Sequence, residues 1–264
     1  DALSHLKTVL KENDLESQFS QLFEMRIGNV RNGENGNHVF QMDSVMESLE
    51  GFTQSEDRDV LLNNLGYVDY PYLICLSDYN RLLEAAGKPA LVLEENEAAV
   101  YQDYDFTTES RMDILNRILS EHPETLLNGN SVYLTGKIQS VDLVTDRSIT
   151  LSFALILPDE QFLQYTNGEY EVYINGILKR EAGKSGSLMT AISDMNARLD
   201  ELCLEDMGIE YESYLQNIGR QLFYMVAASY ITIYLAIIFL VVANTIMGVQ
   251  FLMNQQKTGR RYQT

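Results

Sequence analysis

The most distinctive hydrophobic pattern in this chain is an uncharged run between Gln221 and Gln256. A helix that spans a bilayer needs about 20 predominantly apolar residues. The run is longer, so the helix is expected to tilt or to protrude from the bilayer. A buried core helix of a soluble protein is the alternative, but such helices are rarely so long without a charged residue. We therefore predict a transmembrane helix over residues 216–254.

Seven positions of this helix are predicted to form its transmembrane core. Two of them, Asn244 and Gly248, are the polar or small positions deep in the apolar run, and they favour a contact with another helix over a transport site. The seven are Ala228, Ile231, Leu235, Ile238, Val242, Asn244 and Gly248.

Charge gives the predicted helix a direction. All 38 acidic side chains lie at or before Glu212, whereas four of the 19 basic side chains lie after it, so residues 1–212 carry −23 and residues 213–264 carry +4. Basic flanks of membrane helices stay in the cytoplasm. We therefore expect residues 1–215 to be extracytoplasmic. Such an acidic surface also excludes a nucleic acid as partner.

Ahead of the apolar run, the periodicity alternates between helical and extended segments, which predicts an α+β domain. Helices are expected at 1–12, at 57–65 before Gly66, at 78–86 with Ser77 as N-cap and Gly87 as stop, at 107–121 with Thr107 or Thr108 as N-cap, and at 159–163. Residues 43–49 fit a short helix or a turn. Strands are expected at 38–42, 71–76, 90–93, 98–101, 132–143, 148–157 and 170–174, with a hairpin turn at 145–147. Residues 16–26 fit either a helix or a strand. From Ser187 a long helical pattern continues toward the membrane, with joints at Gly208 or Gly219, and it could pair with the N-terminal helix as a stalk.

The sequence offers no set of residues for catalysis, for a metal or for a cofactor. The histidines His5, His38 and His122 have no ligand spacing. The segment Gly183-Lys184-Ser185 lacks the earlier glycine of a phosphate-binding loop. The two cysteines, Cys75 and Cys203, could form a disulfide in an outward-facing domain or remain two buried thiols. We predict that the chain is not an enzyme.

Three segments carry a family resemblance. The stretch YLAIIFLVVANTIMGVQFLMNQQKTGRRYQT resembles the first membrane helix of FtsX/MacB-type permeases of ABC transporters and the cytoplasmic segment that follows it. In that segment Lys257, Arg260, Arg261 and Tyr262 correspond to the coupling region, although Lys257-Thr258-Gly259 stands where the family often has an acid. Two further segments, PYLICLSDYNRLLEAAGKPALVLEENEAAVY and ALILPDEQF, are similar to strand–helix elements of the external domains of these permeases.

The resemblance implies a multi-pass permease subunit in the cell membrane. Residues 1–215 would form the external domain with stalk helices, residues 216–254 the first membrane helix, and residues 255–264 the start of a cytoplasmic coupling segment. A separate cytoplasmic ABC ATPase would hydrolyse ATP and drive export of, or resistance to, a peptide or lipid-linked substrate. The chain would then be a middle piece of a longer protein, with one rigid helix running from about Ser187 to Gln256. The alternative is the ectodomain and membrane helix of a membrane-anchored sensor.

Overall fold

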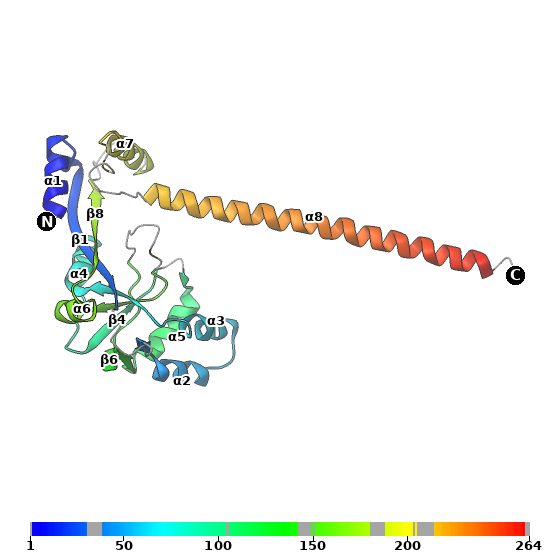
Figure 1. Ribbon diagram of the computed structural model, residues 1–264, viewed down its shortest axis with the longest axis horizontal. Coiled ribbons are helices and arrows are strands. Elements are labelled where there is room, and N and C mark those ends of the chain that lie inside the picture. The colour runs from blue at the N-terminus through cyan, green and yellow to red at the C-terminus, as the bar shows by residue number, and fades with distance from the viewer. Residues whose placement is uncertain are drawn as a thin grey trace. The chain divides into compact units, whose positions relative to one another are not determined.

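A computed structural model describes residues 2–30, 39–103, 106–141, 149, 151–179, 188–202, 204 and 214–261 (Figure 1). The chain divides into two compact units, Asp1–Ser185 and Gly186–Thr264, and each is described by itself. The expected hairpin turn at 145–147 and the expected joint at Gly208 lie outside the described residues.

The first unit is built on an eight-stranded mixed sheet in the order β2-β5-β6-β4-β7-β3-β1-β8. Two pairs of neighbouring strands are parallel, β3 with β7 and β4 with β6, and the pair β3–β7 has antiparallel neighbours on both sides. The strands are β1 (Phe19–Asn29), β2 (Phe40–Gln41), β3 (Tyr72–Cys75), β4 (Glu97–Tyr101), β5 (Glu124–Leu127), β6 (Asn130–Leu134), β7 (Ala154–Leu157) and β8 (Glu171–Leu178). The expected mixture of helices and strands is confirmed.

Helices connect these strands and cover the sheet. In the first unit they are α1 (Ala2–Glu12), a 3-10 turn η1 (Glu16–Gln18), α2 (Asp43–Gly51), α3 (Glu56–Leu65), α4 (Leu76–Ala85), α5 (Glu109–Leu119) and α6 (Asp159–Tyr165). The second unit contains α7 (Leu188–Glu201) and α8 (Tyr214–Arg261). Residues 16–26, which fitted either class of element, form η1 and the first part of β1.

The two faces of the sheet carry two hydrophobic cores, because successive side chains of a strand point to opposite faces. Leu73 of β3 and Leu155 of β7 belong to the core that includes buried residues of α2, α3, α5 and α6. Their neighbours Ile74 and Ile156 belong to the other core, which includes Tyr79, Leu82 and Leu83 of α4. All four residues of β7 are 0% exposed, as expected of a strand buried on both faces.

Two expected strand pairings are wrong. Residues 90–93 form no strand. The Asn80 side chain instead donates to the Leu91 carbonyl (2.9 Å) and accepts from the Leu91 N–H (2.7 Å), which satisfies the backbone groups that a strand partner would use. The expected hairpin between 132–143 and 148–157 is also wrong over the described residues, because β6 and β7 lie on either side of β4 and both pair with it.

The expected helix boundaries are mostly confirmed by their caps. The Thr108 side chain accepts from the Arg111 N–H and starts α5, as its side-chain oxygen allows. Gly66 follows α3, and Gly87, with φ +67°, follows α4 in the left-handed conformation that glycine adopts readily. The helical pattern from Ser187 to Gln256, expected with joints at Gly208 or Gly219, forms two helices. Helix α7 ends at Glu201, and α8 begins at Tyr214 and runs through Gly219 without interruption.

Gly28 of β1 is predicted to be intolerant of a larger side chain. A Cβ atom there would lie 2.7 Å from Thr166 Cγ2 and 3.2 Å from the Glu169 carbonyl oxygen. Overpacking of this kind typically costs about 1–3 kcal/mol, so Gly28→Ala should lower the urea midpoint of unfolding. Adding Thr166→Ser removes the methyl group and keeps the hydroxyl that donates to the Phe162 carbonyl (2.7 Å). The double variant should therefore recover part of the loss; no recovery would contradict a steric cause at Thr166.

Candidate functional site

The apolar part of α8 is the first candidate site. It covers Val226–Asn254, 29 residues, and its most apolar stretch of 18 residues has a mean hydropathy of 2.5. At 1.5 Å per residue this segment is about 43 Å long, more than the ~30 Å hydrocarbon core of a bilayer. Among the helices that the structure describes, it alone is long and apolar enough to cross a membrane.

Exposure separates this helix from the core helix of a soluble protein. A core helix is mostly buried, whereas 0% of the most apolar window of α8 is buried. Large side chains such as Phe239 (71% exposed) and Leu240 (63%) have no cover from the described chain. The seven predicted transmembrane positions, Ala228, Ile231, Leu235, Ile238, Val242, Asn244 and Gly248, all lie in this segment and are all exposed.

The residues predicted for cytoplasmic coupling follow directly. Lys257, Arg260 and Arg261 lie in the last turns of α8, which is one helix from Tyr214 to Arg261. Tyr262 lies outside the described residues. The helix therefore continues from the apolar segment into its basic end. The direction in which it crosses a membrane stays a prediction.

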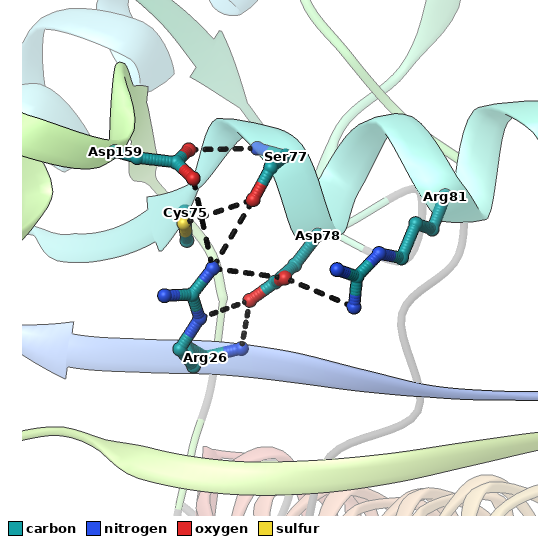
Figure 2. A network of polar contacts seen from close by, with 6 residues as sticks. All are labelled: Arg26, Cys75, Ser77, Asp78, Arg81 and Asp159. Carbon is teal, nitrogen blue, oxygen red and sulfur yellow. Dashed lines mark hydrogen bonds and ion pairs between the residues drawn. The ribbon is translucent and has the colours of Figure 1, made fainter.

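The second candidate is a polar network in the first unit, at the ends of the parallel strands β3 and β7 (Figure 2). Both strands lead directly into helices, α4 after Cys75 and α6 after Pro158. Because the two strands are parallel and in register, Cys75 pairs with Leu157 and the two helix starts lie close together. The carboxyl ends of parallel strands are where α/β folds gather functional side chains.

Asp78 is the centre of this network. Its side chain is 1% exposed and accepts three hydrogen bonds from Arg26: from Nε at 2.6 Å, from Nη2 at 3.1 Å and from the backbone N–H at 3.0 Å. The hydrogen bond from the Arg26 N–H to Asp78 takes the place of a backbone hydrogen bond between β1 and β3. Ile27, Gly28 and Asn29 of β1 pair with β3, but β3 turns into α4 after Cys75, and Asp78 takes the next N–H of β1.

Arg26 joins the two helix starts. Its Nη2 also donates to Ser77 Oγ (3.1 Å) and lies 3.7 Å from Asp159 of α6. The Asp78 hydrogen bonds outweigh partial burial and raise the pKa of Arg26, so its positive charge is permanent. A more exposed arginine, Arg81, lies 3.6 Å from Asp78 on the other side.

Asp159 accepts a hydrogen bond from the N-terminus of α4, a role that we expected the side chain of Ser77 to have as N-cap. Helix α4 begins at Leu76, one residue before the expected cap, and the Ser77 N–H donates to Asp159 Oδ1 at 3.0 Å. Partial burial alone would raise the pKa of Asp159, but the hydrogen bonds from Ser77 lower it below its ordinary value. A negative charge at a helix N-terminus is stabilising, and here the carboxylate comes from another helix.

Cys75 lies beneath this network as a free, buried thiol. The predicted alternatives, a disulfide with Cys203 or two buried thiols, are not tested, because Cys203 lies outside the described residues. Burial raises the pKa of Cys75 to about 11, and its Sγ lies 3.6 Å from Ser77 Oγ. A thiol with so high a pKa is protonated and unreactive at neutral pH.

The network has the chemistry of a structural clamp. Its charges are paired with each other, and it contains no activated nucleophile. Within the described residues, no three His, Cys, Asp or Glu side chains gather as ligands for a metal. Of its members, the sequence signals singled out only Ser77, Cys75 and the Pro158-Asp159 helix start. Arg26 and Asp78 carried no signal, because their partnership joins residues 52 positions apart.

Comparison with known proteins adds no family to this description: no protein-family model matches the sequence, and no curated protein matches it significantly.

Proposed function

We propose that this chain is the external domain and first membrane helix of an FtsX/MacB-type permease subunit of an ABC transporter. A separate cytoplasmic ATPase would move the membrane helix, and the movement would serve export of, or resistance to, a peptide or lipid-linked substrate. The observation that carries the proposal is the continuity of α8. One helix of 48 residues contains the whole apolar segment, a dozen residues before it and the basic end after it.

Continuity matters because an unbroken helix transmits displacement along its axis. Helix α8 is about 72 Å long at 1.5 Å per residue, and it needs no charge inside the bilayer to do this. The separate helix α7 ends at Glu201. In the proposed mechanism, α8 alone, beginning at Tyr214, is therefore the rod that transmits the displacement. The clamp at Arg26 and Asp78 is compatible with this role, because it links strand β1 to the starts of α4 and α6 within the first unit.

Purification of the natural full-length protein from its own membranes in a mild detergent tests the proposal. We expect an ABC ATPase to co-purify, and its ATP hydrolysis to depend on the permease. Co-purification of a kinase or another signalling module without an ATPase would overturn the proposal in favour of the membrane-anchored sensor.

A matched pair of insertions tests the role of α8. Seven glycines inserted after Gly219 should interrupt the helix, since each glycine is about 1 kcal/mol less favourable there than alanine. Seven alanines at the same point add close to two full turns and keep both the helix and its facing. We expect the glycine insertion to abolish the effect of substrate or of the external domain on ATP hydrolysis, and the alanine insertion to retain much of it. Equal coupling in both variants would contradict the rod.

A further inference from the structure

The two edges of the sheet are built differently. On one side the edge strand β2 has only two residues, Phe40 and Gln41. On the other side the edge strand β8 has eight, Glu171–Leu178, and among the described residues it pairs with β1 alone. Short edge strands offer little to another chain, whereas long ones are templates for pairing.

The backbone of β8 presents a defined set of groups at this edge. The Lys179 N–H donates to the Gln18 carbonyl (2.7 Å), and the Ile177 carbonyl accepts from Ser20 Oγ (3.0 Å), so these residues face β1. Backbone groups alternate in an antiparallel ladder. The residues whose N–H and C=O groups face away from β1 are therefore Val172, Ile174, Gly176 and Leu178.

The position of Arg26 confirms this alternation independently. Its N–H points away from β8, toward Asp78. Its neighbours Met25 and Ile27 therefore face β8, and they pair with Tyr173 and Glu171. No described residue bonds the four outward-facing residues, and two of them, Val172 (42% exposed) and Gly176, are open to solvent.

Among the described residues, this edge lacks the devices that protect natural edge strands. The segment Val172–Leu178 contains no proline and no charged residue, and most of its side chains are apolar. Lysine, proline or a bulge normally blocks such an edge. The bulge in this ribbon lies in β1, between Phe19 and Gln21, and not in β8.

Charge decides which partner fits. Residues 1–212 carry a net charge of −23, and the exposed acids Glu169 and Glu171 lie where β8 begins. A second copy of the same domain would bring an equal negative charge to the edge and would be repelled, whereas a basic chain would be attracted. We propose that the free edge of β8 binds an extended basic segment of a partner protein, which adds a ninth strand to the sheet. This inference does not depend on the proposed function.

Peptide binding to the full chain in a nonionic detergent tests the inference. The probe is a capped eight-residue peptide of alternating Lys and Val, and fluorescence anisotropy measures its dissociation constant. A Glu/Val peptide of the same length should bind at least tenfold more weakly, because its charge is reversed. The Lys/Val peptide with every backbone amide N-methylated should also bind at least tenfold more weakly, because it keeps its charge but cannot donate hydrogen bonds to the edge.

Val172 offers a matched pair of variants, because it is 42% exposed at the edge strand. Val172→Lys should weaken binding at least fivefold, and Val172→Glu should leave it equal or tighter. Equal affinity for the N-methylated peptide, or no difference between the two variants, would overturn strand addition. So would a dimer of the chain that Val172→Lys abolishes in sedimentation measurements, since a second copy would then occupy the edge. None of these measurements requires an ATPase, so the result is separate from the test of the proposed function.

Discussion

Replacing Asp78 with alanine is expected to lower the free energy of unfolding of the first unit by about 3 kcal/mol. The substitution removes the acceptor of three Arg26 donors, one of them a backbone N–H, and leaves the Arg26 charge only partly compensated by Asp159 at 3.7 Å. Removing one partner of a buried ion pair costs about 3–5 kcal/mol. The lower end applies here, because Asp78 is 1% exposed but Arg26 is 22% exposed.

Urea unfolding in detergent, followed by near-ultraviolet circular dichroism of the tyrosines, measures this loss. Asp59→Ala is the matched control. Asp59 also pairs with an arginine, Arg58, but it is 52% exposed, so its removal should change stability by less than about 0.5 kcal/mol. Equal effects of the two substitutions would show that Asp78 is not a clamp.

A double variant separates the lost charge from the lost packing. Arg26→Leu combined with Asp78→Leu removes both charges and should be more stable than Asp78→Ala alone, because no unpaired charge stays behind. Recovery should be incomplete, since the backbone N–H of residue 26 still lacks the acceptor that Asp78 provides. If the double variant were less stable than Asp78→Ala, the unpaired arginine would not be the cause of the loss.

Deleting residues 226–254 is expected to change the chain from a membrane protein to one released from membranes. The most apolar 18 residues of this segment have a mean hydropathy of 2.5, and 0% of them are buried, so only lipid or another membrane helix can remove their surface from water. The full chain should stay with the membrane pellet after alkaline carbonate washing, and the deletion variant should move to the supernatant. A full chain that washes off would contradict the membrane span.

A milder change than the deletion can be tested by the same carbonate wash. Arginine at both Ile238 and Val242 costs about 2.5–3.5 kcal/mol per residue at the centre of a bilayer, and should release a large part of the chain.

The direction in which the helix crosses the membrane can be tested by labelling in sealed vesicles. A cysteine at Thr264, in a chain without Cys75 and Cys203, should be accessible to an impermeant maleimide only from the cytoplasmic side. Labelling from outside would reverse the predicted topology.

Local signals along the chain predicted most of the helices. The caps at Thr108, Gly66 and Gly87 act within a few residues of their own positions, so the sequence contains the whole interaction. The apolar span was also predictable, because the free energy of transferring an uncharged, apolar helix from water to lipid does not depend on the rest of the fold. Strand pairing was predicted less well. Residues 90–93 have a strand-like composition, but their backbone partner is the side chain of Asn80 on α4.

The polar clamp shows the same limit more sharply. Ser77 was expected to cap its own helix with its side chain. In the structure its backbone N–H instead donates to the carboxylate of Asp159, 82 residues away. Two aligned parallel strands bring the two residues together, and that alignment depends on β4 and β1 as neighbours of β7 and β3. No local pattern contains this order.

The sequence by itself determined the apolar helix, the contrast between an acidic region and a basic end, and the presence of both helices and strands. These properties depend on the free energy of transfer between water and lipid and on contacts within a few residues. Only the tertiary structure decided which strands are neighbours, that α8 runs through Gly219 without a joint, that Arg26 and Asp78 form a clamp, and that β8 lies at an edge of the sheet. These features depend on contacts between residues that are distant in the sequence. Such contacts form only when the strands of the sheet are arranged in one particular order.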